Sequence, residues 1–181
     1  MKIYIIVFTT LLLLLSACSV TSPDSSYDND LKLISSLSLK EAISTANDWK
    51  LSKPEITSYI NSDEFIVKFP DGREVKKSLP DNEMYVAIAP YLNNTHTCEI
   101  HHLSSCQGEM GKKPFKVIAR DENGQVLFDS EITSMINGFF EMWLPRDRTI
   151  NFKITQDVYS ADLIVKTTRN SKTCITTAQL K

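Results

Sequence analysis

The pattern of apolar and polar positions along the chain changes its period near residue 64. Before that point, apolar residues recur at helical spacing directly after the capping box Ser38-Leu39-Lys40-Glu41. We therefore predict a short amphipathic helix that ends near Trp49. The residues on its apolar face are Leu39, Ala42, Ile43 and Ala46.

A second helix is predicted directly after the first. Ser52-Lys53-Pro54-Glu55 repeats the start signal, with proline in the first turn. Ile56, Tyr59 and Ile60 would then form the buried face of this helix. The N-terminal part of the chain is thus expected to contain a pair of short helices.

From Glu64 onward, alternation with a period of two indicates strands separated by turns. Asn123-Gly124 is the strongest hairpin signal among these turns. The expected strands cover residues 64–69, 74–79, 84–89, 115–120, 126–130, 138–144, 150–154, 161–168 and 173–180.

These elements place the chain in the α+β class, with two domains. Residues 31–92 are predicted to form a small α+β domain, in which the helix pair packs on a small antiparallel sheet. Residues 93–181 are predicted to form a β-rich metal-binding domain. Because its strands follow one another without a long helix, we expect a β-sandwich-like fold there.

The first eighteen residues predict export. Ile3 to Leu15 is an apolar run too short to span a bilayer comfortably, and Leu15-Ser16-Ala17-Cys18 resembles a bacterial lipobox. Residues 1–18 are therefore interpreted as a lipoprotein signal peptide, with lipidation at Cys18 and, because Ser19 follows, an anchor in the outer membrane. A plain cleaved signal peptide is the alternative. Residues 19–30, rich in Ser, Asp and Asn, are expected to be a flexible tether in the periplasm.

Charge excludes one class of partner. The formal net charge is -2 at pH 7, and lysine and arginine are spread along the chain, so nucleic acid is not an expected partner. No second apolar run approaches membrane-spanning length, so we expect membrane contact only through the N-terminal lipid.

The candidate chemistry is concentrated in one stretch, residues 96–110. It holds all three histidines of the chain and two of its four cysteines, and these are donors that transition metals prefer. A straight helix would hold the Cα atoms of Cys98 and Cys106 roughly 12 Å apart, whereas a metal–sulfur bond is only about 2.3 Å long. Either the segment is looped, or one thiol pairs with a distant donor, for which Cys174 is the candidate. The alternative is a small Cys98–Cys106 disulfide beside ordinary surface histidines.

The number of cysteines favours metal ligation. If Cys18 is lipidated, the odd set Cys98, Cys106 and Cys174 leaves at least one thiol without an internal partner in an oxidising compartment. Cys174 lies in the last predicted strand, and first and last strands of a Greek-key sandwich often neighbour each other. We therefore expect one soft ion to be held by Cys174 together with Cys98 or Cys106. Imidazolium, or Lys112 and Lys113, could lower the thiol pKa values there.

The donor set favours copper over zinc. Cu(I) accepts two or three soft ligands, whereas structural zinc sites usually have four ligands with a closer cysteine pair. His101 and His102 could offer nitrogen to Cu(II). If thiols reduced Cu(II), a disulfide would remain, so continued function would need an external thiol reductant.

The spacing Cys98-x2-His101-His102-x3-Cys106-x-Gly108-Glu109-Met110, with the distal Cys174, resembles the CueP family of periplasmic copper-binding proteins. The resemblance implies Cys98, Cys106 and Cys174 as the copper-linked cysteines, with His101 and His102 as neighbouring candidate ligands. It also implies copper sequestration and tolerance, supply of copper to a periplasmic cuproenzyme such as superoxide dismutase, and a homodimer.

Two other function classes remain open. One is a thiol–disulfide redox protein, against which stands the absence of a C-x-x-C motif. The other is a structural lipoprotein with a zinc or disulfide staple. Enzymatic activity is not expected beyond stoichiometric reduction of Cu(II), because no Ser-His-Asp or paired-carboxylate arrangement is visible in the sequence.

Overall fold

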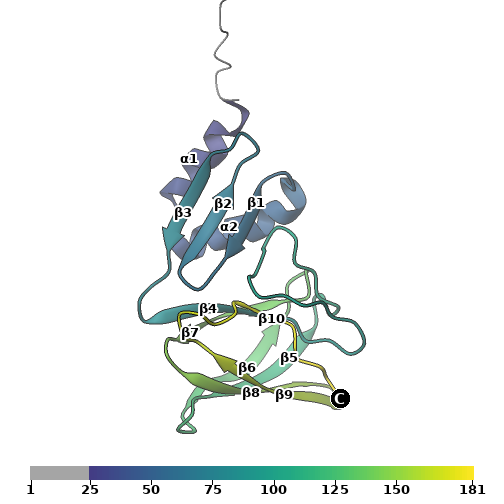
Figure 1. Ribbon diagram of the computed structural model, residues 1–181. Coiled ribbons are helices and arrows are strands. Elements are labelled where there is room, and N and C mark those ends of the chain that lie inside the picture. The colour runs from purple at the N-terminus through teal and green to yellow at the C-terminus, as the bar shows by residue number, and fades with distance from the viewer. Residues whose placement is uncertain (1–24) are drawn as a thin grey trace, which may run out of the picture.

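The computed structural model describes residues 25–181 (Figure 1). The predicted signal peptide, Cys18 and the first part of the predicted tether lie outside these residues. The described chain begins with a short 3-10 helix, η1 (Ser25–Tyr27), followed by α1 (Asp28–Ser36) and α2 (Leu39–Ser52). The predicted capping box is confirmed, since the Glu41 carboxylate accepts hydrogen bonds from the backbone N–H and the hydroxyl of Ser38. No described helix has the length and apolar character needed to cross a membrane.

The structure has a helix pair, but its members differ from the prediction. Residues 54–60 do not form a helix, because Thr57–Ile60 is strand β1. The other helix is α1, so residues 25–30, which we assigned to a flexible tether, are helical. The spacing of Ile56, Tyr59 and Ile60 was too short a signal to separate helix from strand, and pairing with the neighbouring strand decided the outcome.

The two helices cover one face of a three-stranded antiparallel sheet, as Figure 1 shows. The sheet has the order β1–β2–β3, with β2 at Glu64–Lys68 and β3 at Glu74–Ser78. Ile34 of α1, Ala46 of α2 and Phe65 of β2 are among the buried residues of its core. We call η1 to β3 the N-terminal unit.

The remaining strands form two further sheets. One has the order β10–β4–β7, in which β4 (Glu83–Ile88) pairs antiparallel with β7 (Phe140–Pro145) and parallel with β10 (Cys174–Ile175). The other is antiparallel, with the order β6–β5–β8–β9. Its strands are β5 (Pro114–Arg120), β6 (Val126–Thr133), β8 (Thr149–Gln156) and β9 (Tyr159–Lys166).

The α+β class is confirmed, whereas a sandwich made by residues 93–181 alone is not. The two C-terminal sheets do share an apolar core, to which Val86 of β4, Val117 of β5 and Phe152 of β8 contribute. However, β4 is the central strand of its sheet and precedes residue 93. Its alternate side chains also enter different cores, since Tyr85 packs with the N-terminal unit and Val86 with the C-terminal sheets. The continuous apolar run of β4 follows from burial on both faces.

Candidate metal centre

A long connection between β4 and β5, residues 89–113, carries the cysteine and histidine stretch. In Figure 1 this connection extends from the C-terminal sheets toward the N-terminal unit. It is fastened there by an isolated antiparallel bridge, in which the backbone N–H of Ile60 donates to the carbonyl of His101 (2.9 Å). The segment is therefore looped, as one of the two alternatives from the sequence required.

Thr173 joins three separate parts of the chain beside this bridge. Its hydroxyl accepts a hydrogen bond from the backbone N–H of His101 (3.0 Å) and donates one to the carbonyl of Ile60 (2.6 Å). The carbonyl of Glu99 accepts from the N–H groups of Thr173 and Cys174 (3.0 and 3.2 Å). These bonds hold the start of β10 against the loop, so Cys174 lies next to the 98–106 stretch.

The three cysteines meet at this point. Cys98 and Cys174 form a disulfide with their Cα atoms 5.5 Å apart. Cys106 is a free, buried thiol, and its Sγ lies 3.5 Å from the Sγ of Cys98. The proximity that we expected is present, but it arises beside β4, since Cys174 is in register with Ala87. The alternative disulfide between Cys98 and Cys106 is not the one found.

Two overlapping groups of potential metal ligands share the Cys106 sulfur. One consists of His96, Cys98 and Cys106, and the other of His101, Cys106 and Cys174. Within each group the ligand atoms all lie within 4.8 Å of one another. We call the five residues together the thiol cluster. Because two of its sulfurs are joined in the disulfide, full thiolate ligation requires reduction.

His101 is the most enclosed member of the thiol cluster. Its side chain is 0% exposed, and neither ring nitrogen has a hydrogen-bond partner among the described residues. The ring lies between Phe139 and Tyr85, at centroid distances of 4.7 and 6.1 Å. Burial, reinforced by the charge of Lys50, lowers the pKa of His101 to about 3. The imidazole is therefore neutral at pH 7, and each neutral ring offers a lone pair of the kind that copper and zinc bind.

The environment of Cys106 differs from our expectation. Burial raises the pKa of this thiol above its ordinary value, although a hydrogen bond from the His102 N–H and the charge of Lys50 oppose the shift. The nearby cation is Lys50 of α2, which donates to the Cys106 carbonyl (2.5 Å). The prediction that Lys112, Lys113 or an imidazolium would leave a thiolate there is thus wrong for Cys106. Metal binding must displace the thiol proton.

His102 belongs to neither ligand group, and Met110 lies in a different core from Cys106 and Cys174. His102 is exposed, and its ring stacks on Tyr59 at a centroid distance of 5.3 Å. Met110 is buried in the core of the C-terminal sheets. In contrast, His96 joins a group although we had not named it as a ligand. Its position two residues before Cys98 was the only signal in the sequence.

Two glycines set the position of the loop on the sheet. The backbones of Gly108 and Gly138 approach so closely that a Cβ on Gly138 would lie 2.7 Å from the carbonyl carbon of Gly108. Gly138 also has a φ of 80°, which side-chain-bearing residues rarely adopt. This contact directly precedes Phe139, which packs on His101. Sequence reasoning placed Gly138 in a strand and missed this role.

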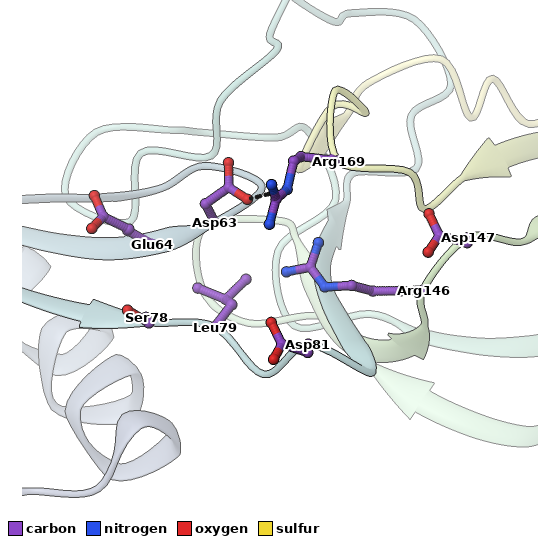
Figure 2. A pocket seen from close by; sticks show the side chains of 8 residues that line it. All are labelled: Asp63, Glu64, Ser78, Leu79, Asp81, Arg146, Asp147 and Arg169. Atoms are coloured by element: carbon purple, nitrogen blue, oxygen red, sulfur yellow. Dashed lines mark ion pairs between the residues drawn. The ribbon is translucent and has the colours of Figure 1, made fainter.

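A cavity of about 520 Å³ occupies another part of the junction between the N-terminal unit and the C-terminal sheets. Figure 2 shows Arg146 and Arg169 projecting into it, with an ion pair between Arg169 and Asp63 (3.3 Å). The Arg146 guanidinium donates to the carbonyls of Pro80 (2.9 Å) and Ser62 (2.7 Å). No cysteine or histidine lines this cavity, so its described lining lacks the soft donors of the thiol cluster. We call it the Arg146 cavity.

Comparison with known proteins decides the family. The model of the family "Periplasmic copper-binding protein CueP" matches residues 41–179, which include the whole thiol cluster. The chain belongs to the CueP family. A solved structure, described as the crystal structure of S.CueP, superimposes on this CueP-family chain with a TM-score of 0.78. It is 29% identical in sequence, and the match covers 88% of this chain and 99% of that one. No curated protein sequence matches the chain.

Membership of the CueP family agrees with the geometry. The family is one of periplasmic copper-binding proteins, and the thiol cluster gathers soft sulfur and imidazole donors within ligand distance of one another. Copper is thus the metal for which the donor set and the family agree.

Proposed function

We propose that this protein holds Cu(I) in the thiol cluster for copper sequestration and tolerance in the periplasm. The observation that carries the proposal is the buried His101, whose two nitrogens lack partners while one ligand atom lies within 4.8 Å of the sulfurs of Cys106 and Cys174. A buried polar atom without a partner is costly unless something binds it. A soft cation would satisfy that nitrogen and both sulfurs at once.

Reduction prepares the site in this proposal. With the disulfide opened, Cys174 and Cys106 would each supply a thiolate and His101 a neutral imidazole, a three-ligand set suited to Cu(I). Cys98 and His96 would form a second, more exposed pair through which the ion could pass by ligand exchange. His102, the remaining predicted ligand, lies outside both groups and would act only before the ion reaches them.

Cu(II) could be reduced on binding, which sets a requirement for electrons. Two Cu(II) ions would take one electron each from two thiolates, giving two Cu(I) ions and a disulfide. The structure supports this step by placing the Sγ atoms of Cys98 and Cys106 3.5 Å apart. Repeated turnover would require a thiol reductant, so the protein is proposed as a stoichiometric copper carrier and not as an enzyme.

The family resemblance supplies the wider context of the proposal. It suggests delivery of copper to a periplasmic cuproenzyme such as superoxide dismutase, and a homodimeric assembly. Anchoring to the outer membrane through a lipidated Cys18 rests on the sequence alone. Neither nucleic acid nor a membrane-spanning segment belongs to this proposal.

X-ray absorption on the copper-loaded, reduced protein tests the ligand set. The expected result is a Cu(I) edge with two or three sulfur neighbours, and with a nitrogen neighbour that disappears in the His101→Leu variant. A control variant, His102→Leu, should leave the spectrum unchanged. A spectrum dominated by nitrogen and oxygen, or one insensitive to His101, would reject the proposed site.

A thiol–disulfide redox protein is the second candidate function. It is favoured by the third sulfur, Cys106, which lies close enough to Cys98 for disulfide exchange. Multiple turnovers of disulfide reduction or oxidation by the metal-free protein, with a peptide substrate, would support this function. Copper binding without such turnover supports the first.

A further inference from the structure

Two adjoining cavities form a groove that reaches the disulfide. The first, of about 500 Å³, is lined by both disulfide cysteines, by His96 and by Lys172. The second, of about 340 Å³, follows β9 and is lined by Lys166. The two share Ile164, Lys172 and Ile175, so they continue into each other between β9 and β10. We call them together the disulfide groove.

The charge of the disulfide groove is of one sign. Among the described residues that line it, Lys166 and Lys172 are the charged ones, and none of these lining residues is an aspartate or a glutamate. Glu99, outside the lining, pairs with Lys172 at 3.0 Å, and both side chains are more than half exposed. No ion pair is found for Lys166 within residues 25–181. The groove is cationic although the whole chain has a formal charge of -2.

The two cysteines of the disulfide both line this groove but differ in exposure. Cys98 is half-buried, whereas Cys174 is 1% exposed. Thiol–disulfide exchange requires the attacking thiolate to reach one sulfur in line with the bond that breaks. The more accessible target is therefore Cys98, and Cys174 is the leaving group.

We propose that the disulfide groove binds small thiols that carry negative charge, such as carboxylate-bearing thiol peptides, and that these thiols reduce the disulfide by attack on Cys98. The inference rests on the proposed copper function, because it names the reductant which that function requires. A cavity of this size fits a small molecule, and the lysines complement its charge.

The reaction balances with two thiols. The first thiolate forms a bond to the Sγ of Cys98, the bond between Cys98 and Cys174 breaks, and the electron pair leaves on the Cys174 sulfur. A second thiolate then attacks the sulfur of the bound small molecule, which leaves as a symmetrical disulfide and frees Cys98. The small thiols are oxidised by two electrons, and the protein disulfide is reduced by two.

The direction of attack has a consequence for copper. Already at the mixed-disulfide stage, Cys174 is released into the group that contains His101 and Cys106. The buried three-ligand site is then complete while Cys98 still carries the small molecule. Attack on Cys174 would instead leave the buried group without one of its thiolates.

The charge preference is tested with three small thiols of similar size on the copper-free, oxidised full chain. These are 2-mercaptoethanesulfonate, 2-mercaptoethanol and cysteamine, which carry negative, zero and positive charge. Rate constants for disulfide loss, expressed per thiolate, should fall in that order, with roughly a fivefold span at low salt that shrinks as salt is added. Equal rate constants, or the reverse order, would overturn the proposal.

Lysine variants test whether the preference for negatively charged thiols arises in the disulfide groove. The double variant Lys166→Gln, Lys172→Gln should reduce the anionic-to-cationic rate ratio to roughly twofold or less. A matched control, Lys113→Gln with Lys116→Gln, removes the same charge from exposed positions elsewhere and should keep the wild-type ratio. The inference is overturned if both double variants change the ratio equally, or if only a protein dithiol reduces the disulfide.

Mass spectrometry tests the site of attack. In the Cys106→Ser variant, which retains the disulfide pair, the mixed disulfide with 2-mercaptoethanesulfonate should be trapped on Cys98; a predominant adduct on Cys174 would contradict the inference. Copper titration of wild-type protein reduced beforehand with a phosphine is independent of the thiol used. Normal copper binding there, with no charge preference in the exchange, would refute the groove inference and leave the copper proposal standing.

Discussion

The Arg146 cavity and the thiol cluster both lie where the N-terminal unit meets the C-terminal sheets, but they differ in how their polar groups are satisfied. Arg146 donates to two carbonyls of the N-terminal unit and the connection after it, and Arg169 pairs with Asp63 (Figure 2). In the thiol cluster, His101 is fully buried with both ring nitrogens unpartnered. The polar groups of the first region thus join the two parts of the fold, whereas the nitrogens of His101 remain available to bind a ligand.

The two regions also differ in the nitrogen groups that they present. The Arg146 guanidinium uses its N–H groups as donors to the carbonyls of Pro80 and Ser62. His101 is held neutral because burial and the nearby Lys50 both oppose its protonation. A neutral imidazole can bind a metal, and a paired guanidinium cannot. The proposed copper site therefore depends on a neutral imidazole as well as on residue type.

The largest expected difference between the two regions is in Cu(I) affinity, when Cys106 is replaced. Cys106 belongs to both ligand groups, so Cys106→Ser should weaken Cu(I) binding by roughly 100-fold or more, since it removes a soft ligand that oxygen does not replace. Competition with a chromophoric Cu(I) chelator, on reduced protein, measures the change. Arg146→Met is the control and should alter the affinity less than about threefold. Unchanged affinity in Cys106→Ser would show that copper is held elsewhere.

The next largest effect should be on the pH dependence of stability, to which the buried His101 contributes. Its folded-state pKa of about 3 lies below the ordinary value of 6.5, so the unfolded chain binds the proton more readily. The free energy of unfolding is therefore unaffected by this group above pH 6.5 and falls as the pH is lowered from there toward 3, at about 1.4 kcal/mol per unit.

Denaturant unfolding of the copper-free protein between pH 8 and pH 4.5 tests this expectation. His101→Leu should remove that share of the pH dependence, and it should raise stability at pH 7 by about 1 kcal/mol because two unpartnered nitrogens are lost. His102→Leu, at an exposed position, is the matched control. Equal pH profiles for wild type and His101→Leu would mean that the ring is not buried as a neutral group.

Replacing Arg146 in the Arg146 cavity should have a smaller effect, which is on stability alone. Arg146→Met removes hydrogen bonds from a charged group to Pro80 and Ser62 and should lower the free energy of unfolding by about 2 kcal/mol. Arg169→Gln, whose ion pair with Asp63 is exposed, should cost less than about 0.5 kcal/mol. Denaturant titration measures both. If the two variants lost similar amounts of unfolding free energy, the hydrogen bonds of Arg146 would contribute no more than an exposed ion pair.

Local signals in the sequence predicted much of the fold correctly. The capping box set the start of α2, and the alternating segments became strands β2 to β9. The error at residues 54–60 has a physical cause. Four residues can satisfy either period, and pairing with β2 made Thr57–Ile60 a strand. The boundary at residue 92 also separated β4 from the strands that pair with it, because β7 and β10 come later in the chain.

The sequence also predicted which residues could act as metal ligands, but not how they are arranged. Cys98, Cys106 and Cys174 were named from their number and spacing, and all three meet in the structure. The cysteine pairing was left open by the sequence. It depends on Thr173, which fixes β10 to His101 and Ile60 through one hydroxyl. His102 appeared equivalent to His101 by residue type, but one ring is exposed and the other fully buried.

The sequence by itself thus determined which soft donors this protein has, that it belongs to the α+β class and where its principal helix begins. These properties depend on residue type and on neighbours within a few positions. Tertiary structure alone decided which sulfurs meet, which imidazole is buried and that the pKa of the Cys106 thiol is raised. Distances and burial arise from packing among segments far apart in the chain, and spacing along the sequence does not encode them.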